Sequence, residues 1–434
     1  MRIARTVYSV VAVLLLLIMM MKRAGDGSVR FYCTAGAGME AFLLDEVKRK
    51  LNATEVEHIP GRVFFRCCSN LHAMMRLKSA ERLFLLLRKA PPTSLPTNPV
   101  KAASVIQQRI VGNPDLWSGV MSSWSSLQAE LNECPGRGQK RRRDEDKDSL
   151  NPPTFRVSCR CSGVNARSYN SQNLNRVIGM AISQQLGWKA DLREPTVNVY
   201  LSDDHCVVGI PLLRQPLATR SYLKHTGLRS TIAWAMASLC NLQEASVVLD
   251  PMCGVGTILL EAVQECPNGV FIGMDSDGAQ LKKAVENVHA AGQKERVLFV
   301  QSSCMALPLP SSSVDAVVCD VPFGRKFHCG VDMNAALPHL LAEMERVLRE
   351  GGTLVLLLSL QLSSLIKKLV PSEALESQSV GSTSETDVFQ GPLNSLLLKS
   401  KHRVSLGSTD ALVHTYTKTH VPRDAQVSDV KCTV

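Results

Sequence analysis

A chain of 434 residues is too long for one ordinary domain, and its 45 % apolar content is enough to bury more than one hydrophobic core. The 49 basic and 39 acidic residues give a formal charge of +10, which favours a polyanionic partner if the excess is concentrated in one region. None of the 14 cysteines forms a Cys-x-x-Cys pair. This spacing argues against a zinc site and favours reduced thiols in an intracellular protein, so we expect no metal.

The N-terminal segment, residues 1–28, contains an apolar run from Val7 to Met21 that is flanked by basic residues. This run is shorter than the roughly 20 residues of a membrane-spanning helix, and it is typical of a signal-peptide core or a short anchor. No convincing cleavage site follows it. We interpret the segment as an extension that does not direct translocation, and we expect no stable association with a membrane.

Residues 29–90 alternate between strand and helix patterns. Strands are predicted over Val29–Cys33 and Gly61–Cys67, and helices over Met39–Leu51 and Leu71–Leu87. The order strand, helix, strand, helix predicts a small α+β unit.

Residues 91–153 predict a linker. Prolines 91, 92, 96 and 99 open it, a polar helix follows, and a run of mixed charge from Lys140 to Asp148 ends it. The lack of apolar periodicity indicates an exposed, partly disordered segment. The basic run Lys140–Arg143 is a solvated charge run, a phosphate contact or a nuclear address. If it is a nuclear address, we expect a protein of the nucleus, or of the nucleus and the cytoplasm.

Residues 154–221 predict an ordered module with a basic excess. A strand over Phe155–Cys161 and a helix over Asn173–Leu186 precede a hairpin of Val197–Leu201 and His205–Ile210. Between positions 156 and 229 the sequence contains ten basic and four acidic residues. We expect this module to bind RNA phosphates, with Arg156, Arg160 and Arg167 as contacts. The alternative is that these arginines only solvate an exposed face.

Residues 222–420 predict a catalytic domain, followed by a tail, 421–434. After a helix over 228–242, apolar strands alternate with helices. The strands are expected at 246–249, 269–274, 297–300, 314–319 and 353–358, and the helices at 257–266, 279–291 and 333–349. A final hairpin is expected at 403–406 and 412–417. Continuous apolar strands with helical crossovers are typical of a Rossmann-like, doubly wound parallel sheet.

The strongest local motif is the segment Val247–Thr257, in which an apolar strand leads through Asp250-Pro251-Met252-Cys253-Gly254-Val255-Gly256 into a helix. Glycines let backbone amides approach a ligand at the N-terminus of a helix. A dinucleotide motif would have glycine where Leu259 stands. The strand-end carboxylate suits a cationic sulfonium better than a pyrophosphate, so the motif favours S-adenosylmethionine over NAD. The alternative is a structural glycine turn.

Two further strands end in acidic residues. Asp275, at the end of Phe271–Asp275, lies where a carboxylate accepts hydrogen bonds from both ribose hydroxyls of a cofactor. The fourth strand ends in Asp320-Val321-Pro322-Phe323. The Asp320 carboxylate and the Val321 carbonyl are suited to hold the hydrogens of a base amine, Pro322 to stiffen the turn and Phe323 to stack on an extruded base.

These motifs resemble those of the class I RNA guanine-N2 methyltransferases that carry a THUMP domain. The resemblance rests on Asp250–Thr257, Asp320–Gly324, Tyr222–Ala233, Phe31–Glu40 and Gly61–Phe65. It implies an N-terminal ferredoxin-like unit (29–90), a THUMP domain (154–221) and a methyltransferase domain (222–420). It also implies S-adenosylmethionine binding by Asp250, Met252, Cys253, Gly254, Gly256, Thr257 and Asp275.

The resemblance further implies the product N2-methylguanosine, in U6 spliceosomal RNA or else in transfer RNA, and a small zinc-binding activator subunit as an obligate partner. The sequence departs from the family at two places. Ser303 stands where the third strand usually ends in an acid that contacts the adenine amine, which predicts weaker cofactor binding. The apolar N-terminus has no counterpart in the family pattern.

Two other interpretations stay open. Ser303 and the apolar N-terminus are compatible with a non-catalytic RNA-binding protein that keeps the methyltransferase fold, although the intact Asp320–Phe323 motif argues against it. Adenine N6, in RNA or DNA, needs the same acceptor geometry as guanine N2. The basic module before the catalytic domain favours RNA.

Overall fold

The computed structural model describes residues 28–68, 71–133, 154–191, 196–323, 333–370 and 393–420. They form two compact units, the second of which begins at Ala218 and also includes Gly36–Met39. The apolar run 7–21, the basic run 140–143 and the tail lie outside these ranges. Within the ranges, no helix has both the length and the apolar character that crossing a bilayer demands.

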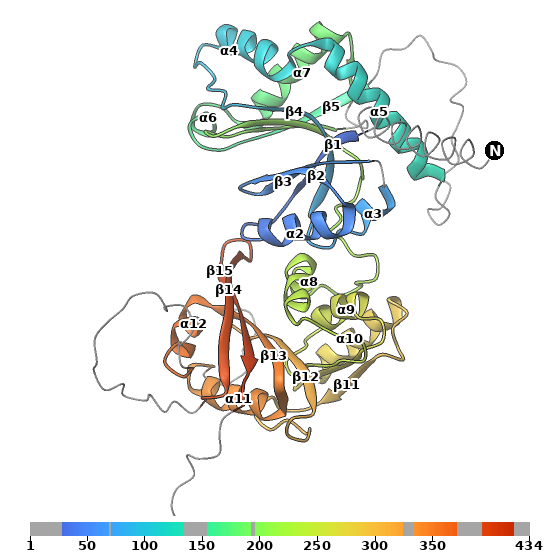
Figure 1. Cartoon of the computed structure of the whole chain (residues 1–434). Coiled ribbons are helices and arrows are strands. Elements are labelled where there is room, and N and C mark those ends of the chain that lie inside the picture. Colours follow the sequence, from blue (N-terminus) through green and yellow to red (C-terminus); the bar gives the residue numbers. More distant parts are fainter. Residues whose placement is uncertain are drawn as a thin grey trace, which may run out of the picture. The chain divides into compact units, whose positions relative to one another are not determined.

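The first unit is built on an eight-stranded sheet with the order β2-β3-β1-β4-β8-β7-β5-β6. Its strands are β1 (Ser28–Thr34), β2 (Thr54–Ile59), β3 (Arg62–Cys68), β4 (Arg82–Ala90), β5 (Thr154–Cys161), β6 (Lys189–Ala190), β7 (Thr196–Leu201) and β8 (Cys206–Pro211). The helices are α2 (Glu40–Leu51), α3 (Leu71–Met75), α4 (Pro99–Val105), the π-helical segment η1 (Ile106–Val111), α5 (Pro114–Glu133), α6 (Val164–Ser168) and α7 (Ser171–Leu186). Because β4 pairs with β8, the strands of 29–90 and of 154–211 form one continuous sheet (Figure 1).

The predicted helix over Leu71–Leu87 is wrong for most of its length. Only the short α3 is helical, and β4 follows it as a central strand between β1 and β8. Five consecutive residues of β4, Leu83–Leu87, are buried because both faces of this strand are covered. A short apolar run of this kind does not distinguish a doubly covered strand from a buried helix.

The prediction of a linker over 91–153 is wrong for residues 99–133. Asn98 caps α4 by accepting hydrogen bonds from the backbone of Val100 and Lys101, and Pro99 occupies the first helical position. Proline is favoured there because that position needs no N–H donor. Ile106, Ile110 and Trp117 are at most 1 % exposed and belong to the hydrophobic core shared with α7 and β5. The prolines therefore mark the start of a packed helical segment.

Helix α7 shows how the local sequence positions this core. The Asn170 side chain accepts a hydrogen bond of 2.8 Å from the Asn173 backbone at the N-terminus, and Gly187 ends the helix with a φ of +72°. The buried residues Leu174, Ile178, Ala181 and Ile182 lie on one face of the helix. This face packs on β5 and η1.

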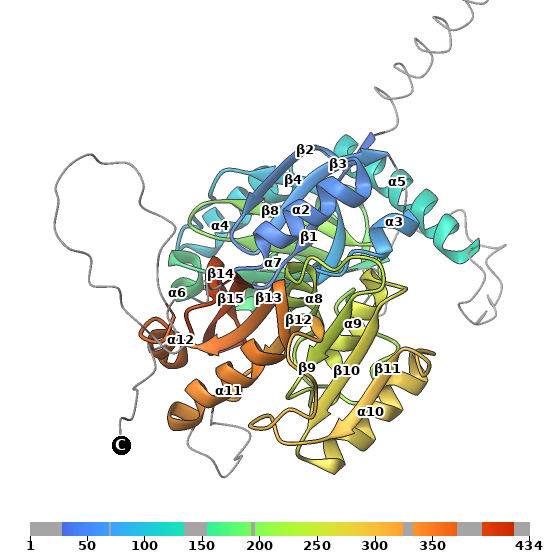
Figure 2. The same cartoon turned by 60° about the horizontal axis from the view of Figure 1, so that its bottom comes forward.

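The second unit contains a seven-stranded sheet with the order β11-β10-β9-β12-β13-β15-β14 (Figure 2). Its strands are β9 (Val247–Asp250), β10 (Val270–Asp275), β11 (Val297–Gln301), β12 (Val314–Asp320), β13 (Leu348–Ser359), β14 (Leu396–Ser405) and β15 (Asp410–Lys418). The helices are α8 (Ser230–Leu239), α9 (Thr257–Glu265), α10 (Gly278–Ala290), α11 (Met333–Val347) and α12 (Leu360–Ile366).

Strands β9 to β13 run parallel, whereas β15 pairs antiparallel with both β13 and β14. The expected doubly wound sheet and its final hairpin are therefore confirmed. The last described strand, β15, lies inside the sheet, between β13 and β14. Its residues Val413 and Tyr416 are at most 2 % exposed. In β13, Leu354, Leu356 and Leu358 belong to the main core of the unit.

Candidate active site

Three acidic residues lie at the carboxyl ends of adjacent strands in the second unit. Asp250 ends β9, Asp275 ends β10 and Asp320 ends β12, and β9 pairs with both of the other strands. Ligands of open α/β sheets bind at this edge, where the strand order reverses on either side of the first strand. The structure therefore brings together the acids that the sequence identified separately.

The Asp275 carboxylate connects β10 to the glycine turn. One of its oxygens accepts a hydrogen bond of 2.9 Å from the Gly254 backbone, and the other accepts one of 2.8 Å from the Asp277 backbone. The Cys253 backbone in turn donates to the Met274 carbonyl at 2.8 Å. Each carboxylate oxygen has a second lone pair, so Asp275 can hold the turn and still accept two ligand hydroxyls.

The glycine turn depends on two left-handed backbone positions. Gly254 has a φ of +53° and Gly256 one of +78°, and a side chain on Gly256 would also meet the Phe299 ring at 3.3 Å. Helix α9 starts directly after the turn. At its first residue, Thr257, the hydroxyl is buried and has no hydrogen-bond partner among the described residues. A buried polar atom without a partner at this position fits a ligand-binding role.

Asp250 is only 1 % exposed, and its carboxylate accepts a hydrogen bond of 3.2 Å from the Met252 backbone. Burial raises the pKa of Asp250 well above its ordinary value, and the charges of Asp320 and Asp275 raise it further. The Met252 hydrogen bond opposes this shift. The Asp250 carboxylate therefore holds the turn through the Met252 backbone, and in its ionised form it would favour a nearby cation.

Asp320 is half-buried, and the desolvation of its carboxyl group raises its pKa from 3.8 to about 7. Among the described residues, no donor forms a hydrogen bond to it. The next residue, Val321, is fully buried, and its backbone donates to the Leu357 carbonyl at 3.1 Å. Pro322 and Phe323 are partly exposed. Asp320 therefore stands directly before a residue whose backbone is hydrogen-bonded to β13 and before two partly exposed residues.

A functional residue that the sequence analysis missed is Asn287 on α10, which is fully buried. Its side-chain oxygen accepts from the Lys224 and His225 backbones at 2.8 and 2.9 Å. Its amide nitrogen donates to the carbonyls of His225 and Val255, both at 3.0 Å. One side chain thus fixes the 224–225 segment against the glycine turn. An asparagine inside a helix gives no signal of this role in a single sequence.

A buried ion pair fixes the start of the same segment. The Arg220 guanidinium donates to the Glu261 carboxylate of α9 at 2.8 and 3.2 Å, and Tyr222 donates its hydroxyl to Glu261 at 2.6 Å. The two charged side chains are at most 4 % exposed. Further along, a side chain on Gly227 would meet Val255 and Thr257 at 2.7 and 2.9 Å. Segment 220–227 therefore lies directly on the glycine turn.

Ser303 is exposed on the loop that follows β11, and its hydroxyl accepts a hydrogen bond of 3.2 Å from the Met305 backbone. The preceding residue, Ser302, donates its backbone N–H to the Asp275 carbonyl at 3.1 Å. Ser303 therefore follows β11, the strand next to β10, at the same edge of the sheet as the three acidic residues.

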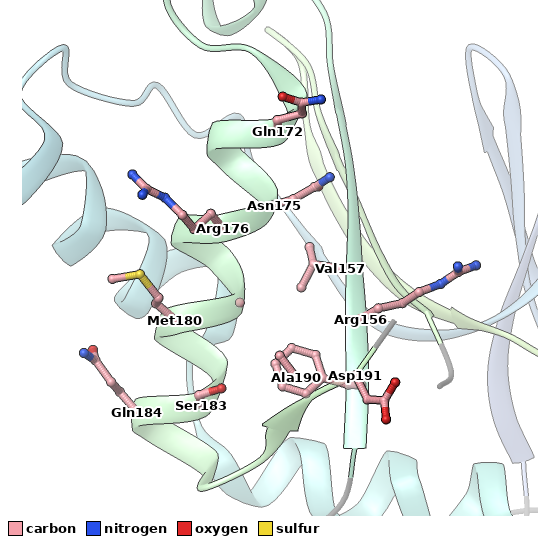
Figure 3. A pocket seen from close by; sticks show the side chains of 12 residues that line it. Arg156, Val157, Gln172, Asn175, Arg176, Met180, Ser183, Gln184, Ala190 and Asp191 are labelled. Atoms are coloured by element: carbon pink, nitrogen blue, oxygen red, sulfur yellow. The ribbon is translucent and has the colours of Figure 1, made fainter. Parts of the chain in front are cut away.

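The predicted RNA contacts divide between two elements of the first unit. Arg156 and Arg160 are four positions apart in β5, and both are exposed, as is Arg167 on α6. A groove of about 600 Å³ lies between α7 and β5. In Figure 3, the side chains of Arg176 and Met180 project from α7, whereas that of Arg156 points away from this helix. The groove contains none of the residues predicted for the cofactor.

Comparison with known proteins connects both units to one family. Residues 218–383 match the family described as "RMKL-like, methyltransferase domain". The U6 snRNA (guanine-N(2))-methyltransferase THUMPD2 of Bos taurus is 39 % identical over 489 residues, covering 91 % of this chain and 96 % of the relative. The tRNA (guanine(6)-N(2))-methyltransferase THUMP3 of Bos taurus is 33 % identical over 232 residues, covering 49 % of this chain and 46 % of the relative.

Among solved structures, TrmN from Thermus thermophilus has the same fold, with a TM-score of 0.64 at 21 % identity over 90 % of this chain and 99 % of that structure. The match to THUMPD2 extends over both units of this chain, and it agrees with the resemblance carried by the glycine turn and the Asp320–Phe323 motif. The chain belongs to the family of THUMP-domain class I methyltransferases that includes THUMPD2.

Proposed function

We propose that this protein transfers a methyl group from S-adenosylmethionine to the exocyclic N2 of a guanine in RNA, with U6 snRNA as the substrate. The observation that carries the proposal is the half-buried Asp320 carboxylate, which ends a strand beside two further strand-end acids and has no hydrogen-bond donor among the described residues. Such a group is suited to a ligand that brings its own N–H donors.

The residues of the glycine turn fit S-adenosylmethionine. The Thr257 hydroxyl needs a partner, Gly254 and Gly256 leave the backbone uncovered, and Asp275 keeps two lone pairs for ribose hydroxyls. Met252 and Cys253 contribute backbone to the turn, and Ser303 takes the place beside the adenine amine. Bound S-adenosylmethionine supplies a methyl group on a cationic sulfonium. The charges of Asp250, Asp275 and Asp320 favour that cation.

In the proposed reaction the protein acts on the guanine amine. The Asp320 carboxylate and the Val321 carbonyl each accept one N2 hydrogen, which draws the nitrogen lone pair out of conjugation and toward the methyl group. Pro322 limits the motion of the turn, and Phe323 stacks on the base. As the new N–C bond forms, the bond between the methyl group and the sulfonium sulfur would break with its electron pair left on sulfur, and the proton that N2 loses would pass to Asp320.

The THUMPD2 relatives support U6 snRNA as the substrate because they match over both units, whereas the tRNA-modifying THUMP3 matches over about half of the chain. Transfer RNA is therefore the second candidate. From the family resemblance we also propose that the protein has a small zinc-binding activator subunit as its partner. We propose a nuclear location on the same basis. A tagged protein found inside a membrane compartment would contradict the location.

The test is to incubate the purified chain, with and without the activator, with S-adenosylmethionine labelled in its methyl group. U6 transcript and a tRNA pool serve as substrates, and the labelled nucleoside is identified after digestion. We expect N2-methylguanosine in U6 RNA. N6-methyladenosine, or label in tRNA alone, would contradict the assigned substrate. No label with either RNA, although the activator is bound, would favour a non-catalytic RNA-binding protein.

A further inference from the structure

The loop that follows β11 contains neither helix nor strand, and we call its residues 302–310 the Ser303 loop. It starts where the Ser302 backbone donates to the Asp275 carbonyl at the end of β10. Inside the loop, the Ser303 hydroxyl accepts from the Met305 backbone at 3.2 Å. Pro308 and Pro310 bring no N–H donors. The rest of the loop backbone therefore needs partners from another element.

Two side chains of α11 supply these partners. The Leu307 backbone donates to the Glu343 carboxylate at 2.7 Å. The Arg346 guanidinium donates to the carbonyls of Leu307 and Leu309 at 2.9 and 2.8 Å. The same guanidinium binds both oxygens of Glu343, at 2.8 and 2.9 Å. Glu343 and Arg346 thus form one unit that clamps the middle of the loop from both its donor and its acceptor side.

Helix α11 can hold the loop because the helix itself is fixed. It lies against β13 (Figure 2) and buries one side in the main core of the second unit. The buried residues on that side are Ala336, Leu337, Leu340, Leu341, Met344 and Val347. His339, Glu343 and Arg346 follow one another at intervals of four and three positions, which places them on one neighbouring side. His339 adds a hydrogen bond of 2.9 Å to the Met305 carbonyl.

The Glu343–Arg346 pair is better suited to holding the loop than to stabilising the helix alone. Its side chains are 18 % and 34 % exposed, and an ion pair of this exposure contributes little stability by itself. Hydrogen bonds from Arg346 and from the Leu307 backbone hold the pKa of Glu343 down, from 4.5 to about 2. The carboxylate is therefore charged at neutral pH, and its hydrogen bond to the loop is charge-assisted.

The proposed cofactor makes the conformation of this loop important. Ser303 stands where an acidic side chain would bind the adenine amine with a charged hydrogen bond. A neutral hydroxyl binds an amine less strongly, and the Ser303 hydroxyl already accepts one hydrogen bond from Met305. A loop that must be ordered on binding would lower the affinity further, because ordering costs conformational entropy. Adenine binding at this serine therefore depends on a loop that is already held in place.

We infer that Glu343 and Arg346 are positioning residues for the adenine of S-adenosylmethionine and act through the Ser303 loop. The inference rests on the proposed function, because it takes S-adenosylmethionine as the cofactor and Ser303 as the neighbour of its adenine. The pair holds the loop backbone, and the loop presents the Ser303 hydroxyl to the purine amine. Glu343 and Arg346 thereby set the affinity for the cofactor and the preference for a purine that carries this amine.

The test titrates the full chain with two ligands by calorimetry. One is S-adenosylhomocysteine, and the other is its analogue with hydrogen in place of the 6-amino group of the purine. The variants are Arg346→Met, Arg346→Lys and Glu343→Gln. The matched control is Arg349→Met, because Arg349 is an exposed arginine that pairs with Asp315, at the end of β12 away from Asp320.

We expect the parent to bind S-adenosylhomocysteine about fivefold more tightly than the analogue, which is the value of one neutral hydrogen bond. Arg346→Met should bind S-adenosylhomocysteine about tenfold more weakly than the parent, and the analogue at most about threefold more weakly. The preference for the amine should therefore fall below about twofold. Arg346→Lys, which can still reach one carbonyl, should lie between the two, and the control should bind like the parent.

Methylation kinetics distinguish positioning from a general loss of structure. Arg346→Met should raise the KM for S-adenosylmethionine about tenfold and leave kcat within about twofold of the parent, because binding and not chemistry is weakened. A parent-like KM and ligand preference would overturn the inference. Equal losses for both ligands together with a lower kcat would overturn it as well. If Arg346→Met does not fold, Glu343→Gln, which keeps an acceptor for the Leu307 backbone, decides by the same ligand preference.

The outcome can be separated from that of the proposed function, because ligand binding needs no RNA. A parent that binds S-adenosylhomocysteine with the expected dependence on Arg346, but methylates no guanine, would contradict the proposed reaction alone. A parent that methylates guanine, while Arg346→Met keeps the parent's ligand preference, would contradict the role of Glu343 and Arg346 alone.

Discussion

The seven-stranded sheet carries acidic residues at the ends of its strands, whereas the eight-stranded sheet carries basic residues on one of its faces. The last residues of β9, β10 and β12 are Asp250, Asp275 and Asp320, so the strand backbone fixes where each acid stands. Arg62 and Arg160 are long side chains on strands far apart in the sheet order. The first arrangement is suited to chemistry at a few fixed atoms, whereas the second distributes positive charge over an area. The predictions below test this division.

The largest effect is expected from Asp320→Ala. This change removes the proposed acceptor for the guanine amine and should lower the rate of methyl transfer at least about 100-fold, as for a positioned polar group in other active sites. Single-turnover assays with saturating RNA and cofactor measure the loss. The affinity for RNA should stay at the parent level. A parallel loss of RNA affinity would break the division between the two sheets.

Asp275→Ala should weaken the binding of S-adenosylmethionine by about 2 kcal/mol, or about 30-fold, because a charged acceptor is lost. The same change frees the Gly254 backbone donor, so part of the effect comes from the turn. Asp275→Asn, which retains one acceptor oxygen, should fall between the variant and the parent. An unchanged dissociation constant in calorimetry would place the ribose elsewhere.

The pH dependence should follow the half-buried Asp320 carboxylate. Because its pKa is raised from 3.8 to about 7, the acceptor form is lost as the pH falls through neutrality. The value of kcat/KM, measured at low cofactor concentration, should therefore rise about tenfold between pH 6 and pH 8. A flat profile over this range would show that the ionisation of Asp320 does not limit the reaction.

Protein stability provides a control for this assignment. An acid with a raised pKa in the folded state destabilises the fold increasingly as the pH rises from its unfolded pKa to its folded one, here from about 4 to about 7. Asp320→Asn removes this titration. Its free energy of unfolding relative to the parent should grow over that interval and stay level above it, as measured by urea unfolding.

The smallest effect is expected from Ser303→Asp, which adds an acid beside the existing ones at the same edge of the sheet. The exposed position lets the new carboxylate stay hydrated, so its desolvation costs little. The affinity for S-adenosylmethionine should stay level or increase by up to about tenfold, the value of one hydrogen bond. A clear loss of affinity would mean that the loop after β11 does not approach the adenine.

The chemistry of the second unit was predictable because a parallel βα repeat brings the strand ends to one edge without any knowledge of register. Each acid follows an apolar run that is visible in the chain, as in Val247–Asp250 and Val314–Asp320. Asn287 was not predictable, because its four backbone partners come from two segments that only the folded structure places beside α10.

The contact between Arg62 and Tyr200 depends on information that a single sequence does not contain. Arg62 stands in the first quarter of the chain and Tyr200 near its middle, and their contact requires both the pairing of β4 with β8 and the curl of the sheet. The basic excess around Arg156 and Arg160 was visible, but not the neutralisation of other cations such as Lys89 by Glu57. The sequence pattern therefore indicates where basic residues are concentrated, but it does not show which of them pair with acidic residues.

The position of β15 has a consequence for synthesis of the protein on the ribosome. Strand β15 is the last described strand of the chain, yet it pairs on one side with β13 and on the other with β14. Until residues 410–418 leave the exit tunnel, β13 and β14 have no partner between them, and the hydrophobic core that includes Tyr416 is incomplete. The described strands of the first unit all end at or before Pro211 in the chain and do not wait for residues 410–418. A premature stop codon before Asp410 would therefore leave the first unit able to fold and the second with two unpaired strand edges, which are sites of aggregation and degradation.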